Sequence, residues 1–438
     1  MAEKQQATKP QKSIWRKLLW LWILLSVLGT IILAVVVWQG IVNYSPDDGW
    51  YGNGKSWSKT DAFTEDYYNQ MLSYTFNDAR GDGKLRIMQL ADPQLKLFND
   101  PADKKTMELV GLAIDKMQPD LVVVTGDLTL SVFPRATVKK FCEFLEDKQV
   151  YWTFTYGNHD SEFSLSKYRH SQLFANYKYC LFDGGPSTIK GESNYFVNIK
   201  DGGGKLLYAL CMVDSNMYPE DRTDVFAWEY DELHQTQVDW YAWSISGLQS
   251  IRPDVKSSVF MHIPLARYNE VYASGAYVGQ VDEAPKKDEN GNQIGAGIYH
   301  QGGGGGEAFY NQMLALGSST SVFCGHDHIN TMRGTTSDNL LMAYGRCCGY
   351  HTYPFFETQT DSLFEKLISN IFGYTGKTLY LDQWVDQNGN PLGKGVSMIE
   401  IDVSNAATYG NIRMYDVNHD YLLGKTTQIQ NEIFYSAD

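Results

Sequence analysis

The chain has 438 residues, 43% of them hydrophobic and 14% aromatic, so it is long and apolar enough to form a sizeable folded core. Its formal net charge is -14. Because proteins bind a nucleic-acid backbone through basic surface patches, a nucleic-acid partner is not expected. The six cysteines are too few for a disulfide scaffold, and they lack the spacing of a zinc finger.

The first 17 residues are basic and directly precede a long apolar run. Residues 18–42 contain no charged side chain, and about 20 apolar residues are enough to cross a bilayer. Tryptophans lie toward both ends of this run, as is common at membrane interfaces (Trp15, Trp20, Trp22 and Trp38). Because a basic flank stays in the cytoplasm, we expect a cytoplasmic tail (1–17), a transmembrane signal anchor (18–42) and an extracellular remainder at the plasma membrane.

A cleaved signal peptide is the alternative interpretation of the same run. The apolar stretch is longer than the roughly 7–15 residues of a signal-peptide core, and no small-x-small cleavage site follows it. These two features favour an uncleaved anchor. The next segment, residues 43–83, is rich in Gly, Asp, Ser and Tyr, and we expect it to form a juxtamembrane stalk or an entry segment to the folded domain.

From residue 84 onward, strand-like and helix-like patterns alternate, which favours a single layered α/β domain over residues 84–438. Strands are expected at 85–90, 120–125, 150–155, 195–199, 206–213, 258–261, 320–324, 340–343, 396–401 and 411–415. Helices are expected at 104–117, 136–145, 165–177, 235–248 and 308–316. Residues 268–306 are loop-like, and residues 354–392 suggest an insertion of a helix and a hairpin.

Five short polar motifs follow the ends of predicted strands. They are Asp92-Pro93-Gln94, Gly126-Asp127, Gly157-Asn158-His159-Asp160, Met261-His262 and Gly325-His326-Asp327-His328. Loops at the carboxyl ends of strands in open α/β sheets converge on ligand sites. One such motif alone carries little weight, since an isolated histidine is more often structural than a ligand. Five of them, each at a strand end, predict one shared site.

In this order the motifs resemble those of the calcineurin-like metallophosphoesterase superfamily, which read D-x-H, G-D, G-N-H-D/E, H and G-H-x-H. The segments ESNYFV, MVDSN, QVDWYAW, FMHIPL and FCGHDHIN resemble a branch of purple-acid-phosphatase-related enzymes that lacks the purple chromophore. In the purple enzymes a tyrosine stands three positions after the bridging aspartate, and here that position is Leu130. The resemblance covers about residues 84–350 and implies a layered αββα sandwich.

The resemblance also implies a site with two divalent metal ions. Asp92, Gln94 and His328 would hold the first ion, and Asn158, His262 and His326 the second. Asp127 would bridge both, and His159 would act on the substrate as a general acid. Two ions about 3.5–4 Å apart clamp a phosphoryl group and activate a bridging hydroxide. Asp160 would either orient His159 or cap the following helix.

Gln94 departs from the family pattern, because that position is usually a histidine. A glutamine can ligate only through its amide oxygen, a harder and more weakly binding donor than an imidazole nitrogen. The change shifts the expected first metal toward Mn²⁺ or Mg²⁺ and away from Zn²⁺. Mn, Fe, Zn and Mg all remain candidates for the pair.

Together these features predict a metal-dependent hydrolase of phosphate esters, with a phosphatase favoured. A phosphorylated small molecule, lipid or glycan is the expected substrate, and the anchor makes the membrane a further partner. One alternative is a phosphodiesterase that uses the same site. The other is a non-catalytic, membrane-anchored binding module with a degenerate metal site, for which Gln94 is the support. Arg346 either reaches a substrate phosphate or forms a buried structural pair.

Overall fold

The chain forms two compact units, Met1–Pro46 and Asp47–Asp438. The computed structural model describes residues 12–43, 56–96, 101–131, 134–162, 166–219, 230–281, 286–287, 293–294, 297–352, 357–358, 378–379 and 393–437.

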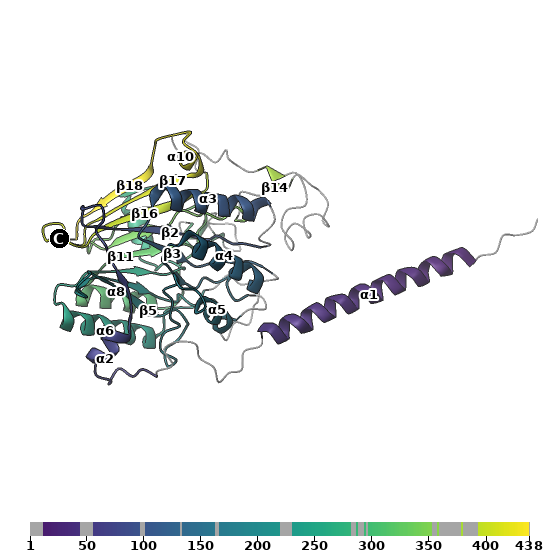
Figure 1. Cartoon of the computed structure of the whole chain (residues 1–438), viewed down its shortest axis with the longest axis horizontal. Coiled ribbons are helices and arrows are strands. Elements are labelled where there is room, and N and C mark those ends of the chain that lie inside the picture. The colour runs from purple at the N-terminus through teal and green to yellow at the C-terminus, as the bar shows by residue number, and fades with distance from the viewer. Residues whose placement is uncertain are drawn as a thin grey trace, which may run out of the picture. The chain divides into compact units, whose positions relative to one another are not determined.

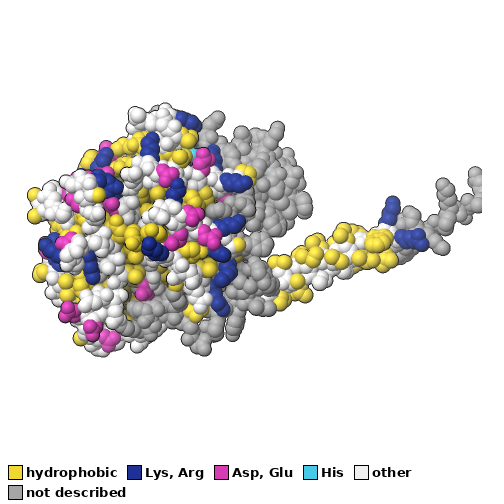
Figure 2. All heavy atoms as spheres, in the orientation of Figure 1, with side chains coloured by type: hydrophobic (Ala, Val, Ile, Leu, Met, Phe, Trp, Pro, Cys, Tyr) yellow, Lys and Arg dark blue, Asp and Glu magenta, His cyan; other side chains and the backbone are white. Residues whose placement is uncertain are grey.

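The described part of the first unit is one helix, α1 (Lys12–Asn43). Its stretch Arg16–Val35 has a mean hydropathy of 2.6, and its length and composition suit a membrane span. Apolar side chains cover the helix, and basic side chains lie at one end of it (Figure 2). This helix agrees with the predicted membrane segment, although an N-terminal signal sequence has the same composition.

The second unit contains two large mixed sheets. The eight-stranded sheet has the order β1-β5-β6-β7-β11-β13-β12-β8, and the six-stranded sheet has the order β18-β17-β16-β2-β3-β4. The strands of the first are β1 (Leu72–Thr75), β5 (Tyr195–Lys200), β6 (Leu206–Met212), β7 (Ser257–Phe260), β8 (Tyr277–Val278), β11 (Ser319–Cys324), β12 (Arg333–Thr335) and β13 (Leu341–Tyr344). Those of the second are β2 (Lys84–Leu90), β3 (Leu121–Thr125), β4 (Trp152–Thr155), β16 (Gly395–Asp402), β17 (Ile412–Asn418) and β18 (Gln430–Tyr435).

Helices cover the outer faces of both sheets (Figure 1). The core that contains α3 and α4 packs on the six-stranded sheet, and the core that contains α6 and α8 packs on the eight-stranded sheet. Among the described residues of this unit, the helices are α2 (Glu65–Gln70), α3 (Pro101–Met117), α4 (Pro134–Lys148), α5 (Lys167–Phe174), α6 (Gln235–Ile251), α7 (Tyr268–Ser274), α8 (Gly305–Leu316) and α10 (His419–Leu422). The arrangement is the predicted αββα sandwich.

The sequence of β3 explains why this strand lies at the centre of the sandwich. All five residues of LVVVT are buried, because alternate side chains of a strand point to opposite faces and both faces are covered. Leu121 and Val123 belong to the core between the two sheets, whereas Val122 and Val124 belong to the core beneath α3 and α4. The strand pairs in parallel with β2 and β4, so the loops after all three leave from the same edge of the sheet.

The segment before residue 84 differs from the predicted stalk. Strand β1 pairs in parallel with β5 at the edge of the eight-stranded sheet. Trp57 and Tyr68 are buried in the core beneath α6, and the ring of Phe63 lies over Gly247 of that helix. A Cβ atom at Gly247 would lie 2.0 Å from the Phe63 ring, so the glycine is needed for this contact. Residues 56–83 are therefore part of the folded unit.

The two segments predicted to interrupt the regular pattern have different outcomes. Segment 268–306 contains more regular structure than expected, and most of segment 354–392 lies outside the described residues. Helix α7 and strand β8 occupy the beginning of the loop-like segment 268–306, and two short strands follow, β9 (Lys286–Lys287) and β10 (Gln293–Ile294). Of the predicted insertion 354–392, the structure describes only β14 (Glu357–Thr358) and β15 (Thr378–Leu379), which pair antiparallel, as a hairpin would.

Candidate metal centre

The structure brings all eight sequence-predicted site residues together. They follow three strands of one sheet and two strands of the other: Asp92 and Gln94 after β2, Asp127 after β3, Asn158 and His159 after β4, His262 after β7, and His326 and His328 after β11. Strand β7 pairs in parallel with β11, as β2 and β4 do with β3. The loops of the two sheets therefore meet over the inter-sheet core.

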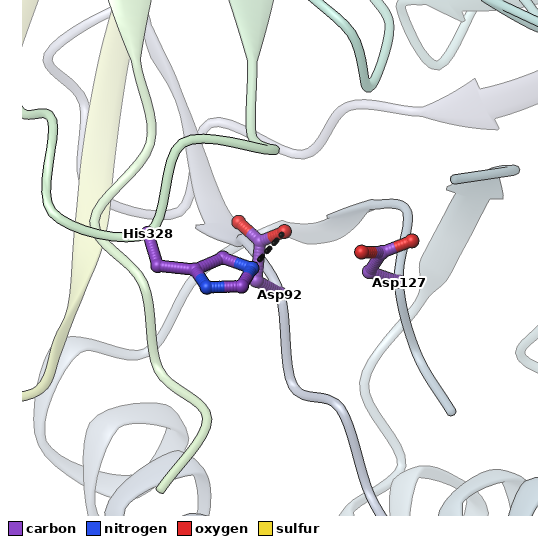
Figure 3. A group of neighbouring side chains, drawn as sticks. All are labelled: Asp92, Asp127 and His328. Carbon is purple, nitrogen blue, oxygen red and sulfur yellow. Dashed lines mark ion pairs between the residues drawn. The ribbon is translucent and has the colours of Figure 1, made fainter. Parts of the chain in front are cut away.

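The first group consists of Asp92, Gln94 and His328. His328 Nε2 lies 3.7 Å from Asp92 Oδ1, and Gln94 Nε2 lies 3.1 Å from His328 Nε2. One ligand atom from each of Asp92, Asp127 and His328 lies within 4.8 Å of the other two, and all three residues are buried (Figure 3). This is the spacing that a single metal ion requires of its ligands.

The second group consists of Asn158, His262 and His326. His262 Nε2 lies 3.1 Å from Asn158 Oδ1 and 3.3 Å from His326 Nδ1. The other ring nitrogen of His262 donates a hydrogen bond to the backbone oxygen of Thr125 at 2.8 Å. That bond fixes the orientation of the imidazole and leaves Nε2 directed at the site, as second partners of metal-binding histidines commonly do.

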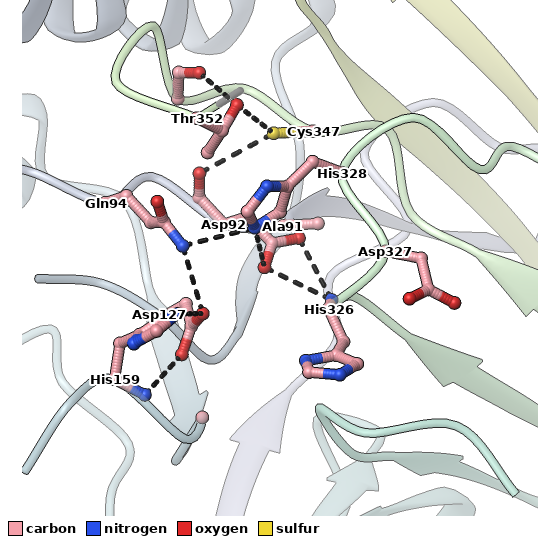
Figure 4. Close-up of polar contacts among 12 residues, drawn as sticks. Ala91, Asp92, Gln94, Asp127, His159, His326, Asp327, His328, Cys347 and Thr352 are labelled. Atoms are coloured by element: carbon pink, nitrogen blue, oxygen red, sulfur yellow. Dashed lines mark hydrogen bonds and ion pairs between the residues drawn. The ribbon is translucent and has the colours of Figure 1, made fainter. Parts of the chain in front are cut away.

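Asp127 contacts both groups with different carboxylate oxygens. Its Oδ2 accepts a hydrogen bond from Gln94 Nε2 at 3.2 Å (Figure 4). Its Oδ1 lies 3.3 Å from His262 Nε2. The carboxylate of Asp127 therefore lies between the two groups.

The backbone of the site is held in an unusual conformation. Asp92, Gln94, Asp127 and His326 all have positive φ angles, between 42° and 76°. Residues other than glycine adopt this region at a cost, and such residues often cluster at functional sites.

Two glycines allow the loops to approach closely. A Cβ atom at Gly126 would lie 2.6 Å from His262 Nδ1, and one at Gly157 would lie 2.2 Å from Asp127 Oδ1. The glycines of the GD and GNH motifs therefore leave room for the ligands beside them.

Asp160 has neither of the roles expected from the sequence. Its carboxylate accepts hydrogen bonds from the backbone N–H groups of Asp127, Leu128, Thr129 and Gly157, at 2.8–3.2 Å. The helix that follows, α5, is capped by Ser166 instead. Asp160 thus ties the loop after β3 to the loop after β4, and it fixes the backbone on both sides of Asp127.

Glu162 is a site residue that the sequence analysis missed. Its Oε2 lies 2.6 Å from His159 Nδ1, and its Oε1 accepts a hydrogen bond from the hydroxyl of Tyr218 at 2.9 Å. The Nε2 atom of His159 lies 3.8 Å from Asp127 Oδ2. The signal in the sequence is a carboxylate three residues after the histidine, but Asp160 stands even closer to it and obscured this role.

The carboxylates and histidines of the site shift one another's pKa values. Burial, and then the charge of Asp127, raise the pKa of Asp92 to about 7. Burial acts in the same direction on Asp127, but His262 and His159 more than offset it and hold its pKa well below the usual range. Burial lowers the pKa of His262, yet the two carboxylates prevail and raise it to about 9.

The remaining histidines divide into two classes. Burial, which acts against the charged ring, holds the pKa values of His326 and His328 well below the usual range, so both rings are neutral and able to bind a metal. Burial has the same effect on His159, but Asp127 and Glu162 offset it and raise the pKa to about 9. The carboxylates of Asp127 and Glu162 therefore favour the protonated form of His159.

The donor set fits a pair of divalent ions. The neutral imidazoles of His326 and His328, an ionised carboxylate and an amide oxygen are ligands that Mn²⁺, Fe²⁺ and Zn²⁺ accept, and His262 would bind an ion by releasing the proton on Nε2. Gln94 presents its amide nitrogen to Asp127 and His328, and a half-turn of the amide would bring its oxygen to the same place. Several lone pairs converge here with little room between them, which is an arrangement that a cation stabilises.

A buried polar cluster lies behind the first group. The thiol of Cys347 lies 3.7 Å from the backbone oxygen of Asp92, and Lys394 donates to that thiol at 3.1 Å and also to Thr352. Figure 4 shows Cys347 and Thr352 beside Asp92. The ammonium group lowers the pKa of Asp92 in opposition to burial. This cluster therefore supports the loop after β2 and partly balances its charge.

The side chain of Arg346 is buried and bonds to the backbone. Its guanidinium donates to the backbone oxygen of Gly393 at 3.1 and 2.5 Å, and the residue is 4% exposed. This agrees with the structural alternative for Arg346.

The comparisons with known proteins agree with this geometry. The family model of calcineurin-like phosphoesterases matches residues 85–330, more than half of the chain. "Probable inactive purple acid phosphatase 28" of Arabidopsis thaliana is 23% identical over 308 residues, which cover 63% of this chain and 72% of that protein. "Phosphatase DCR2" of Saccharomyces cerevisiae is 25% identical over 300 residues, which cover 60% of this chain and 48% of that protein.

Among solved structures, a dimetal phosphatase from Danio rerio aligns at 10% identity and a TM-score of 0.44, and covers 81% of this chain and 99% of that one. The match of the family model, on motifs that meet at a single site, shows that this chain belongs to the calcineurin-like phosphoesterase family, and its curated relatives are proteins of the purple-acid-phosphatase type.

Proposed function

We propose that this protein hydrolyses phosphate esters, monoesters in preference to diesters, at a site with two divalent metal ions. The observation that carries the proposal is the position of Asp127. Its carboxylate lies between two groups of metal-binding side chains and 3.8 Å from His159 Nε2. A carboxylate placed to bind two ions, beside an imidazole that can donate a proton, suits the hydrolysis of a phosphate ester.

In this proposal Asp92, Gln94 and His328 hold the first ion, Asn158, His262 and His326 hold the second, and Asp127 binds both. The ions, when bound, offset the charge on the phosphoryl oxygens and lower the pKa of a bound water. Neighbouring groups fix the positions of these side chains. Asp160 accepts a hydrogen bond from the backbone N–H of Asp127, and the backbone oxygen of Thr125 orients the ring of His262.

His159 is the proposed general acid. Because Glu162 accepts the proton on Nδ1, the second nitrogen of the ring faces Asp127 and the site. A protonated Nε2 at that place can donate to the oxygen of the departing alcohol. Glu162 acts through His159 and is a positioning residue, and Tyr218 holds Glu162 from the other side.

The membrane part of the proposal rests on α1. A basic end followed by an apolar helix supports a single-pass anchor with the amino terminus in the cytoplasm and the phosphoesterase unit outside the plasma membrane. An anchored site encounters phosphorylated lipids, glycans and small molecules close to the bilayer, and these remain the proposed substrate classes.

A non-catalytic binding module is the second candidate, and two observations favour it. Gln94 replaces the usual histidine, and three curated relatives carry the word "inactive" in their names. A phosphodiesterase at the same site is the other alternative within the enzyme class.

One hydrolysis experiment separates these functions. The full chain, purified in detergent and supplied with Mn²⁺, is expected to release nitrophenol from p-nitrophenyl phosphate faster than from bis-p-nitrophenyl phosphate. A chelator should abolish both reactions, and added Mn²⁺ should restore them. Faster turnover of the diester would favour the phosphodiesterase. If neither ester is hydrolysed with Mn²⁺, Fe²⁺, Zn²⁺ or Mg²⁺, the result would favour the non-catalytic binding module.

The variant Glu162→Gln tests the proton donor. We expect its rate to fall about 10-fold more with an alkyl phosphate than with p-nitrophenyl phosphate, since general acids supply about 10²–10⁴-fold and matter most for poor leaving groups. Nitrophenolate departs readily without a proton. The matched control is Glu143→Gln, an exposed position on α4. An equal loss with both esters would show that Glu162 does not act through proton donation.

A further inference from the structure

A groove of about 450 Å³ lies beside the starts of strands β3 and β4. Two residues that line it directly precede these strands: Asp120 precedes β3, and Tyr151 precedes β4. The proposed metal-binding residues Asp127 and Asn158 follow the other ends of the same two strands. The two strands run in parallel, and a strand of this length spans roughly 13–17 Å. The groove is therefore separate from the metal centre.

Tyrosines from both large sheets line the groove. Tyr74 belongs to β1, at the edge of the eight-stranded sheet, and Tyr151 adjoins β4, at the edge of the six-stranded sheet. Their ring centroids are 5.3 Å apart, with an angle of 72° between the ring planes, and Tyr151 meets Tyr179 in the same way. Tyr74 and Tyr151 are half-buried and pack against the core between the sheets. The packing of both sheets therefore fixes this aromatic wall.

The charged side chains that line the groove are paired with other described residues. Lys148 Nζ donates to both carboxylate oxygens of Asp115, at 2.8 and 2.7 Å. Asp120 accepts hydrogen bonds from Arg80 Nη1 at 3.0 Å and from the backbone N–H of Arg86 at 2.8 Å. Because each of these carboxylates already faces a cation or an N–H group, a charge on the ligand would gain little here.

Uncharged hydrogen-bonding groups also line the groove. Gln118 directly follows α3, Gln149 directly follows α4, and both are exposed. Their side-chain amides, and the hydroxyls of Tyr74 and Tyr151, have no hydrogen-bond partner among the described residues. Amides and phenols can both donate and accept hydrogen bonds, as the hydroxyl groups of a sugar do. The groove thus combines tyrosine rings with uncharged polar groups that are free to bind a ligand.

We propose that this groove binds an uncharged glycan, and that it does so apart from any reaction at the metal centre. Tyrosine offers an apolar ring and a polar hydroxyl, which match the C–H faces and the hydroxyl groups of a sugar ring. The volume of the groove falls within the range of roughly 300–1,000 Å³ that is usual for ligand sites. Bound glycan holds the phosphoesterase unit on a glycan-bearing surface and takes no part in hydrolysis.

Binding to immobilised oligosaccharides tests this inference. The full chain is purified in a detergent without a sugar head group, so that the detergent does not compete. It is applied, with a chelator present, to neutral hexasaccharides of glucose, galactose, mannose and N-acetylglucosamine and to their sulfated forms. We expect retention on at least one neutral hexasaccharide and no gain in affinity from sulfation. The chelator removes metal ions, so that retention through the metal centre is excluded.

Substitutions at the groove locate the binding. Gln149 has a φ angle of 52°, which glycine adopts without strain, so Gln149→Gly should keep the fold while it removes an amide. It should weaken binding about 3- to 10-fold, as the loss of one or two hydrogen bonds does. Tyr151→Leu should weaken binding about 10-fold, since it removes the ring and the hydroxyl. Gln428→Ala, at an exposed glutamine outside the groove, is the matched control and should bind as the unchanged chain does.

Each result decides for or against the inference. Failure of the unchanged chain to bind any neutral hexasaccharide would overturn it, as would a preference for the sulfated forms or equal binding by the Gln149→Gly chain. If Tyr151→Leu fails to fold, Gln149→Gly still decides. Because the binding is measured without metal ions, a chain that binds glycan but hydrolyses no ester would support the groove and refute the proposed catalysis.

Discussion

An Asp127→Asn chain is expected to lose more than about 100-fold of its turnover, because even partners outside the ligand shell of a metal typically contribute 10–100-fold. The substitution keeps the shape of the side chain and one oxygen, which can still accept the bond from His159 N. It removes the charge that faces both ligand groups. Calorimetry with Mn²⁺ should show weaker binding at both positions, alongside the loss of p-nitrophenyl phosphate hydrolysis.

The fold should survive this change. Asp127 is 1% exposed, and despite this burial the charges of His262 and His159 hold its pKa well below the usual range, so the neutral amide should lower the unfolding temperature while the transition stays cooperative. Asp420→Asn, an exposed aspartate on α10 that pairs with Lys425, is the control and should retain full activity. An unchanged rate in the Asp127→Asn chain would refute the shared-ligand role.

Removal of residues 1–75 is expected to unfold the phosphoesterase unit, whereas removal of residues 1–46 should leave it folded. The chain that lacks residues 1–75 loses β1, which covers the edge of β5, and it loses Trp57 and Tyr68 from the core. Loss of a buried large aromatic side chain costs about 3–5 kcal/mol, and a domain has only about 5–15 kcal/mol of stability. Thermal unfolding followed by circular dichroism should show a cooperative transition only for residues 47–438.

Single substitutions separate the contributions of this segment. Trp57→Ala, which truncates a side chain that is 9% exposed, should lower the unfolding temperature by several degrees. Phe434→Ala, at a side chain that is 72% exposed, should change it little. A fully stable chain that begins at residue 76 would indicate that residues 56–75 act as the stalk predicted from composition.

Much of the site could be predicted from the sequence, because its residues directly follow strands. A buried apolar run such as LVVVT predicts a covered strand, and the residue that follows it, as Asp127 follows β3, must lie at the sheet edge where loops converge. The order of the five motifs then predicted which side chains would meet. The ligand roles of these residues remain predictions, and the contacts around Asp127 are where they can be tested.

The contacts of some site residues depend on the direction in which the side chain points in the folded structure. Two carboxylates follow His159, and spacing alone does not distinguish Asp160, which accepts four backbone N–H groups, from Glu162, which holds the imidazole. The positive φ of Gln94 is likewise a consequence of the packing around it. Such choices are made by surrounding atoms that lie far away along the chain.

Long-range pairing also decided the limits of the folded unit and the surroundings of the site. Composition indicated a stalk before residue 84, since a short edge strand such as β1 has no recognisable pattern apart from its partner β5. The hydrogen bond between Tyr218 and Glu162 could not be predicted for the same reason, because the two residues lie 56 positions apart and meet only in the folded chain. The sequence by itself determined the long apolar helix α1, the buried strands and the motif residues, all of which are local patterns. Only the tertiary structure decided which distant groups contact them, because those contacts arise from the packing of the two sheets.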